Sequence, residues 1–122
     1  RRAMRKQSES QLVTSCLKWL QIMENLGKIA WCDRNNSGAI FTGKYRLRLH
    51  RAGTPDITVY TNLGIVIHIE CKAGNEKQGD EQINFQLMVN RFSNHHYIII
   101  RSSDELVKYF EGAESLKKVR DE

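Results

Sequence analysis

Hydrophobic and polar positions follow a helical period near the start of the chain. Between residues 8 and 25, apolar side chains recur at intervals of three and four, at Leu12, Cys16, Leu20 and Met23. This spacing predicts an amphipathic helix. Ser8 and Gln11 have the spacing of a capping box, which favours a helix start at this point. The sequence Asn25-Leu26-Gly27 supplies the stop signal.

Two further helices are expected in the second half of the chain. Asp80 opens a segment with an apolar stripe, made by Ile83, Leu87, Met88 and Phe92, which predicts a second amphipathic helix. Ser102 and Glu105 repeat the capping-box spacing before a helix that we expect to run through Phe110.

Residues 44–51 alternate strictly between two kinds of side chain. Tyr45, Leu47 and Leu49 share one face, and the other face carries Lys44, Arg46, Arg48 and His50. Such alternation predicts a strand with one buried face and one wet, positively charged face.

Other strands are expected at residues 28–32, 56–60, 64–71 and 97–100. The stretch 64–71 is apolar almost without interruption, as is typical of a central strand covered on both faces. Polar, glycine-containing stretches at 34–39 and 72–81 predict loops, and we expect His95 and His96 in a loop as well. The order of elements predicts an α/β fold with a mixed central sheet flanked by helices.

Length and charge narrow the class of protein. The 122 residues fit one compact domain spanning 1–122, with residues 1–7 expected as a flexible arm. No apolar run approaches the roughly 20 residues that span a bilayer, so we expect no membrane partner. Three widely spaced cysteines favour reduced thiols in a cytoplasmic protein. The net charge of +5 is a mild bias towards polyanions, of which nucleic acid is the commonest.

Residues 56–60 and 65–71 are separated by a short turn containing Asn62 and Gly64, which predicts an antiparallel hairpin. If the turn is centred on residue 63, Asp56 and Glu70 face each other, with Cβ atoms about 4.5–5.5 Å apart. A β-bulge would shift this register by one residue. Lys72 points to the same face as Glu70, because side chains alternate along a strand.

The predicted cluster of two carboxylates and one ammonium suits a hard divalent ion. Facing carboxylates repel, and one of them is driven towards protonation unless a cation lies between them. Mg²⁺ takes one or two carboxylates and fills its remaining positions with water and phosphate oxygens. Lys72 is placed to orient an attacking water and to stabilise negative charge in a phosphoryl transition state. The alternative is a solvated pair of strand-end carboxylates with a surface ion pair between Glu70 and Lys72.

Five ordered elements resemble the VRR-NUC (virus-type replication-repair nuclease) branch of the PD-(D/E)xK nuclease superfamily. They span roughly residues 8 to 110 and comprise Glu9 on the first helix, RNNSGA at 34–39, GTPD at 53–56, IECK at 69–72, and Gln82 at the start of the following helix. The resemblance implies a PD-(D/E)xK restriction-endonuclease-like core. It also implies small, stand-alone relatives of phage or bacterial origin that act as homodimers on branched DNA.

The resemblance also implies roles for individual residues. Asp56 and Glu70 would bind Mg²⁺ or Mn²⁺, with the backbone carbonyl of Cys71 as a third ligand and Glu9 as a further candidate. Lys72 would be the catalytic lysine, and Gln82 would help position the site. Valine is commoner in this family where Cys71 stands here, which a backbone ligand tolerates. On the residues alone, Glu9 and Gln82 are also ordinary first-turn residues of helices.

Candidate DNA contacts come from the polar loop and the basic strand. These residues are Arg34, Asn36, Lys44, Arg46, Arg48 and Arg51. The basic strand residues and Arg51 lie just before GTPD, which favours contacts with phosphate. The polar loop of Arg34, Asn35 and Asn36 suits backbone or phosphate contacts. The alternative is an ordinary turn and an exposed strand whose charges guard it against edge pairing.

Together these patterns predict a metal-dependent, structure-specific DNA endonuclease that hydrolyses phosphodiesters through a metal-activated water. Four-way junctions are the favoured substrate, and a twofold homodimer would supply the two cuts that such a junction needs. The alternatives are another PD-(D/E)xK nuclease, restriction-like or nicking, and a basic nucleic-acid-binding module whose acidic cluster is structural.

Overall fold

The computed structural model describes residues 7–36 and 38–112 of the protein. The elements, in chain order, are α1 (Glu9–Asn25), β1 (Trp31–Arg34), β2 (Ala39–Thr42), β3 (Tyr45–Arg48), β4 (Ile57–Tyr60), β5 (Val66–Cys71), α2 (Asp80–Val89), β6 (His95–Ile100) and α3 (Ser103–Gly112). The flexible N-terminal segment expected at residues 1–7 lies outside the described residues except for Gln7. The side-chain amide nitrogen of Gln7 donates to Ser15 Oγ at 2.9 Å.

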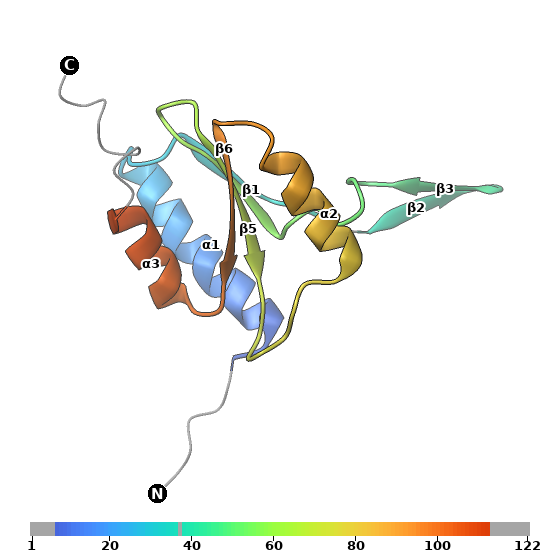
Figure 1. The fold of residues 1–122 in the computed structure, drawn as a ribbon, viewed down its shortest axis with the longest axis horizontal. Helices are drawn as coiled ribbons and strands as arrows, with labels where there is room; N and C mark the ends of the chain where they lie inside the picture. The colour runs from blue at the N-terminus through green and yellow to red at the C-terminus, as the bar shows by residue number, and fades with distance from the viewer. Residues whose placement is uncertain (1–6, 37, 113–122) are drawn as a thin grey trace, which may run out of the picture.

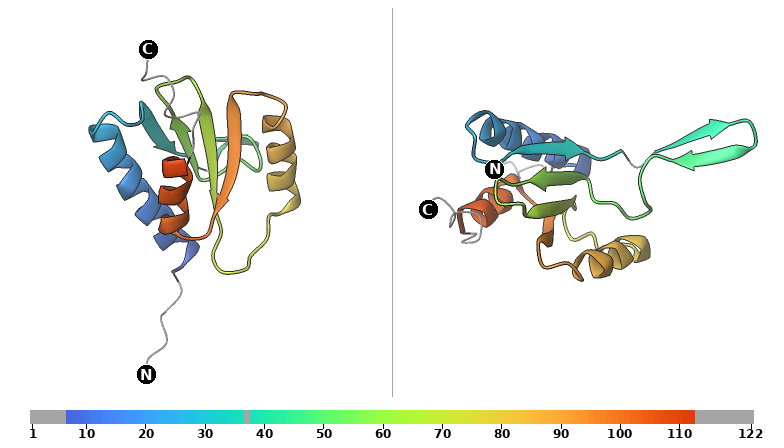
Figure 2. Two further views of the ribbon diagram at one scale, coloured as in Figure 1. Left: turned by 60° about the vertical axis from the view of Figure 1, so that its left-hand side comes forward. Right: turned by 90° about the horizontal axis from the view of Figure 1, so that it is seen from above.

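A four-stranded mixed sheet forms the centre, in the order β1-β4-β5-β6 (Figure 1). β1 and β5 both run antiparallel to β4, whereas β6 runs parallel to β5. Figure 2 shows α1 and α3 on one face of this sheet and α2 on the other. The predicted mixed sheet flanked by helices is therefore confirmed. None of the described helices is long and apolar enough to cross a bilayer.

The core lies between α1 and the two central strands. Leu12, Cys16 and Leu20 of the predicted helical stripe are buried, and they belong to one cluster with alternate side chains of β4 and β5. The expectation of a central strand at 64–71 is confirmed, because β5 is buried along almost its whole length. Burying such apolar side chains contributes about 1.5–3 kcal/mol each relative to leaving them in water.

The predicted helix starts are confirmed at α1 and α2. Ser8 Oγ accepts from the Gln11 N–H at 3.1 Å, and Gln11 Oε1 accepts from the Ser8 N–H at 2.9 Å, so the capping box is complete. α1 then ends before Gly27, whose φ of 74° is the left-handed geometry that favours glycine after a helix. α2 begins at Asp80, as the sequence predicts.

The strand at residues 44–51 does not join the central sheet, so the prediction of a buried face is wrong. β3 pairs only with β2, and the two form a hairpin that projects from the body (Figure 1); we call it the arm. Tyr45 is 70% exposed, Leu47 53% and Leu49 41%. The alternation correctly identified a strand, but burial depends on a covering layer, which a separate hairpin lacks. The loop expected at 34–39 is shorter, because β1 includes Arg34 and β2 begins at Ala39.

The apolar stripe expected on α2 is also not its buried face. Ile83, Leu87 and Phe92 are 39%, 61% and 51% exposed, whereas Phe85 and Val89 are buried. Only the narrow Phe85–Val89 side of the helix meets the sheet. The strand after α2 begins at His95, where we expected a loop, because His95 pairs with Val66 of β5.

Gly53 lets the loop before β4 pack against the first turn of α2. Its φ is 81°, and a Cβ at this position would collide with the carbonyl group of Glu81. Any side chain here would therefore meet helix backbone, which cannot give way as a flexible side chain can. The glycine of the GTPD sequence thus allows the loop that carries Asp56 to approach the helix that carries Gln82.

We predict that Gly53→Ala strongly destabilises the protein, with Gly64→Ala as the matched control. Both glycines have a positive φ, but a Cβ at Gly64 has no atom within 4 Å. Gly64→Ala should cost only the left-handed strain, about 1–2 kcal/mol. Gly53→Ala adds a backbone collision, for which overpacking suggests about 1–3 kcal/mol more. Urea denaturation of both variants measures the difference, and equal losses would contradict the close approach.

Candidate active site

The hairpin of β4 and β5 has the register that the sequence predicts. Ile57 pairs with Ile69, and Tyr60 pairs with Val66. The ladder has no bulge between these pairs, and continuing its register by one residue would set Asp56 opposite Glu70. The two strands are also joined at this end by the Cys71 N–H, which donates to Asp56 Oδ2 at 2.8 Å.

Glu70 and Lys72 form a buried ion pair on one face of β5. Lys72 Nζ lies 3.6 Å from Glu70 Oε2. Lys72 is only 6% exposed and Glu70 only 3% exposed. The alternative of a solvated surface pair is therefore wrong. Burial matters because a charge inside a protein is attracted or repelled more strongly than in water.

Gln82 joins this carboxylate to the start of α2. Its side-chain oxygen accepts from the Gly79 N–H at 2.9 Å, which caps the helix. Its side-chain nitrogen donates to Glu70 Oε2 at 3.0 Å. A single amide therefore fixes the helix start and the Glu70 carboxylate relative to each other.

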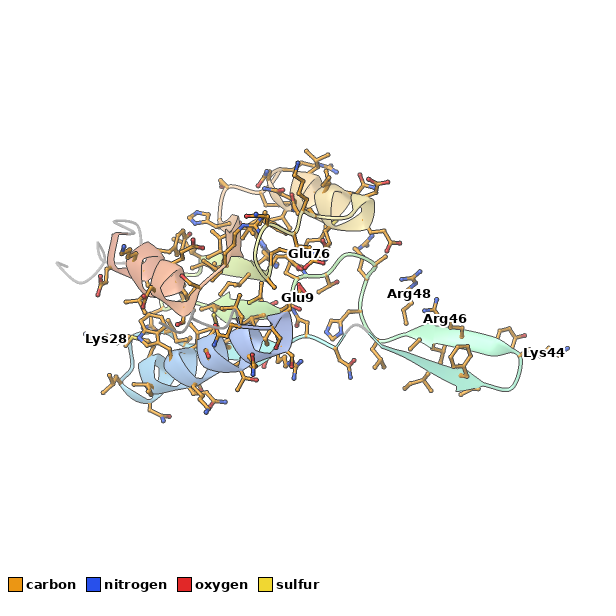
Figure 3. The ribbon with its side chains drawn as sticks, turned by 90° about the horizontal axis from the view of Figure 1, so that it is seen from below. Glu9, Lys28, Lys44, Arg46, Arg48 and Glu76 are labelled. Carbon is orange, nitrogen blue, oxygen red and sulfur yellow. The ribbon has the colours of Figure 1, made fainter. Side chains whose placement is uncertain are left out.

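Glu9 reaches the same place from α1. Figure 3 shows it at the end of α1 nearest the arm, with Glu76 close by. Burial, reinforced by the negative charges of Asp56 and Glu76 and opposed by Lys72, raises the pKa of Glu9. Its Oε1 is buried and has no hydrogen-bond partner within residues 7–36 and 38–112. An orphaned buried carboxylate oxygen of this kind fits a site that receives a cation or a polar ligand.

The carboxylates hold protons more tightly than they would in water. Burial and the nearby charge of Asp56 raise the pKa of Glu70 to about 7, against the opposing effect of Lys72. Burial also raises the pKa of Asp56, although the Cys71 N–H, Lys72 and Arg34 oppose this shift. The cluster therefore carries more negative potential than its single ammonium balances.

The donor set fits one hard divalent ion. Asp56 uses Oδ2, and Glu70 uses Oε2, for the contacts already described. One oxygen of each carboxylate is left without such a contact in the described part of the chain. Among those residues, no group of three or more His, Cys, Asp and Glu side chains is arranged to hold a metal. A Mg²⁺ site needs no such group, since one or two carboxylates with waters suffice.

Cys71 offers the site its backbone and not its thiol. Its side chain is fully buried beside Cys16 in the core, because alternation turns residue 71 away from the face of Glu70 and Lys72. The neighbouring Cys16 and burial raise the pKa of the Cys71 thiol. A small apolar residue would serve equally at this position.

An open cleft of about 540 Å³ borders the carboxylate cluster. Lys72 and Gln82 line its inner part, and the base of the arm and the loop after β5 form its walls. The basic lining residues are Arg48, His50, Arg51, Lys72 and Lys77. Glu76, Asp80 and Glu81 line the same cleft, so its charge is mixed, with four permanent cations and three carboxylates. The cations are the groups that could contact an anion.

The residues predicted to contact DNA lie in four places: the cleft, the arm, the end of β1 and the turn that follows it. Arg48 and Arg51 line the cleft, and Figure 3 shows Arg46 beside Arg48 on the arm, with Lys44 at the tip. Arg34 lies at the end of β1, near enough to Asp56 for its charge to oppose the rise in the pKa of that carboxyl. Asn36 is instead engaged in a turn, where its Oδ1 accepts from the Gly38 N–H at 2.9 Å.

Two residues at the site, and the bonding partners of a third, were not predicted from the sequence. Lys77 and Glu76 enter from the loop after β5, and a lysine in a glycine-containing loop just beyond Glu-x-Lys was the available signal. Asn35 fastens the loop before β4, since its amide donates to Pro55 O at 2.9 Å and to Thr58 Oγ1 at 2.8 Å. No sequence signal identified these long-range bonds.

Comparison with family models and with curated proteins identifies no relative of this chain. No protein-family model matches the chain, and no curated protein matches it in sequence. The likeness to VRR-NUC nucleases therefore rests on the sequence motifs of this chain alone.

We predict a pH-dependent gain of stability for Glu70→Gln in metal-free buffer. The pKa of Glu70 is about 7 in the fold and 4.5 ordinarily. Between these values the folded protein binds more protons than the unfolded chain, so wild-type stability falls as pH rises. Glutamine never ionises, so the stability of the variant relative to the wild type should increase from pH 4.5 to 7. Above pH 7 the difference should stay constant.

Thermal denaturation of both proteins in EDTA measures this difference. Glu111→Gln is the matched control, because Glu111 is exposed near the end of α3, and its profile should run parallel to the wild type. A constant offset between Glu70→Gln and the wild type across this range would contradict the buried, proton-holding carboxyl.

Proposed function

We propose that this protein is a Mg²⁺- or Mn²⁺-dependent DNA endonuclease of the PD-(D/E)xK type that cleaves branched DNA. The convergence of five residues from α1, the start of β4, the end of β5 and α2 carries the proposal. These residues are Glu9, Asp56, Glu70, Lys72 and Gln82. Sequence spacing alone predicted only the Asp56, Glu70 and Lys72 group, so the arrival of the other two from separate helices is independent support.

Asp56, Glu70 and the backbone carbonyl of Cys71 would hold the cation, with Glu9 as the nearest additional carboxylate. Such an ion, when bound, polarises a phosphoryl oxygen and lowers the pKa of a water. Gln82 keeps Glu70 in a fixed orientation through the bond to Oε2. The raised pKa of Glu70 implies that binding a cation releases a proton near neutral pH.

Lys72 is the residue of this chain best placed to meet the scissile phosphate. Its ammonium is buried beside Glu70 and lines the cleft. It would donate hydrogen bonds to phosphate oxygens and stabilise the negative charge that grows there in the transition state. Because Glu70 holds the ammonium in place, little reorganisation would accompany this charge development.

The cations of the cleft and arm support DNA as the substrate. Arg48, Arg51 and Lys77 would neutralise backbone phosphates on either side of the cut. Branched DNA, and a twofold dimer acting on it, follow from the family resemblance and from the need for paired cuts. A restriction-like or nicking activity on linear DNA is the nearest alternative, and cytoplasmic location and phage origin stay predictions.

A binding module without catalysis is favoured by one observation. Asp56, Glu70 and Lys72 already satisfy part of one another's charge and hydrogen bonding, as a structural cluster would. The orphaned Glu9 oxygen favours the enzyme instead, because buried oxygens without a partner are uncommon in purely structural clusters.

We predict that Lys72→Ala and Asp56→Asn each lower the cleavage rate of a labelled four-way junction. Removing a single charge-stabilising or ligating group costs about 10²–10³-fold or more. EDTA should abolish cleavage, and excess Mg²⁺ or Mn²⁺ should restore it. Gel assays with junction, flap, splayed-arm and linear duplex measure both rate and preference.

Asp33→Asn is the matched control for Asp56→Asn, because Asp33 is an exposed acid on the neighbouring strand β1. It should cut at the wild-type rate. Wild-type cleavage by both site variants would reject the catalytic assignment. Equal cleavage of all substrates would reject the branched specificity and keep the nuclease.

We predict that Arg46→Ala and Arg48→Ala weaken DNA binding without regard to sequence. Each lost phosphate contact should reduce the slope of log affinity against log salt by about 0.9. Fluorescence anisotropy over a salt series, with the inactive Asp56→Asn protein as background, measures the slope. Arg91→Ala removes the same charge at the far end of α2 and should leave the slope unchanged; a change equal to that of Arg46→Ala would show a non-specific charge effect.

A further inference from the structure

The arm has two chemically different faces. Directly opposed residues of an antiparallel pair share a face, so the register of Ile40 with Leu47 and Thr42 with Tyr45 puts these side chains together. Leu49 joins them, because its N–H donates to the Gly38 carbonyl and extends the ladder. We call Ile40, Tyr45, Leu47 and Leu49 the apolar arm face. The opposite face carries Phe41, Arg46 and Arg48.

The two faces have different surroundings. Arg48 belongs to the lining of the cleft, and Figure 3 shows Arg46 and Arg48 pointing to the same side of the arm. The apolar arm face is turned the other way, and each of its four residues is at least 41% exposed. A two-stranded hairpin is at best marginally stable in water. Covering the apolar arm face would therefore stabilise the arm.

A second uncovered apolar surface lies on α2. Ile83, Leu87, Met88 and Phe92 form the α2 stripe, of which Leu87 and Phe92 are more than half exposed. An apolar cavity of about 270 Å³ opens beside the stripe, lined by His68, Phe85, Met88, Val89, Phe92 and His95. The stripe is therefore a surface with a recess able to accept a bulky side chain.

We propose that the apolar arm face of one copy of this chain packs on the α2 stripe of a second copy, and that the contact is reciprocal. The arm projects away from the body (Figure 1), so its apolar face is presented outward. In a twofold dimer each copy contributes an arm and also receives one. The proposal supplies the interface for the homodimer of the proposed function and rests on that function for its biological purpose.

The size of the two surfaces argues for a reciprocal arrangement. Stable specific interfaces bury about 800 Å² on each partner, more than four partly exposed side chains provide. Arm and stripe together roughly double the apolar area that each copy buries. The edges of the two surfaces are complementary in charge as well, since Lys44 lies at the tip of the arm (Figure 3), whereas Asp80 and Glu81 lie in the first turn of α2.

This arrangement would place the active sites of the two copies on either side of one interface. The base of the arm and the first turn of α2 both border the cleft. An arm that packs on the α2 stripe of a second copy would therefore lie near the cleft of that copy, with its cationic face turned away from the stripe. Two adjacent sites related by a twofold axis are what paired incision of a four-way junction requires.

Sedimentation equilibrium without DNA or metal tests the interface. The wild type should be a dimer at micromolar concentration. Leu47→Asp on the arm and Leu87→Lys on the stripe should each raise the dimer dissociation constant at least about 30-fold, as loss of a central interface residue does. Both positions are exposed, so circular dichroism should show unchanged folding.

Mixing the two variants gives the decisive result. In a mixed dimer, the aspartate introduced on the arm of one copy meets the lysine introduced on the stripe of the other copy. The second contact of the same dimer joins a wild-type arm to a wild-type stripe. The mixture should therefore recover dimers that neither variant forms alone. Failure to recover them, a monomeric wild type, or a Leu87→Lys protein that stays dimeric would each overturn the proposal.

Two matched controls replace equally exposed apolar residues elsewhere. Phe41→Asp alters the opposite face of the arm, and Ile22→Lys alters α1; both residues are more than half exposed. Both proteins should remain dimeric. The test is separable from the proposed function, because an interface of this kind without DNA cleavage would reject only the nuclease, and a monomeric nuclease would reject only the interface.

Discussion

Burial of Glu70 opposite Asp56 is the constraint on which the rest of the site depends. Two carboxylates that face each other in a poorly solvated place repel, and burial alone disfavours their charged forms. The fold answers with one buried ammonium, one amide from α2 and one backbone N–H from β5. These partners balance part of the negative potential. The negative potential that is not balanced, together with the orphaned Glu9 oxygen, is the basis of the proposed cation site.

α2 connects this electrostatic centre to the surface that surrounds it. Gln82 caps the helix and holds Glu70, while Gly53 allows the loop before β4 to touch the Glu81 backbone. The same helix forms a wall of the cleft and presents apolar side chains on its outer side. A change in the position of α2 would therefore alter the carboxylate geometry, the cleft and the proposed interface together.

The candidate site was predictable from sequence where the determining geometry is local. A short hairpin has few registers, so the turn around residue 63 sufficed to align Asp56 with Glu70, and strand alternation placed Lys72 with them. The inclusion of Glu9 and Gln82 came only from the family resemblance. Their distances from Glu70 depend on how two helices pack on the sheet, and no periodicity encodes that. The bonds from Asn35 to Pro55 and Thr58 were missed for the same reason.

The sequence by itself determined which side chains share a face: Leu12 with Cys16 on α1, Tyr45 with Leu47 on the arm, Ile83 with Leu87 on α2. Only the tertiary structure decided which of these faces is buried. The face on α1 is covered by the central sheet, whereas the arm stands apart and α2 meets the sheet through Phe85 and Val89. The physical reason is that periodicity follows from the local backbone, while burial requires a second surface supplied by distant residues or by another chain.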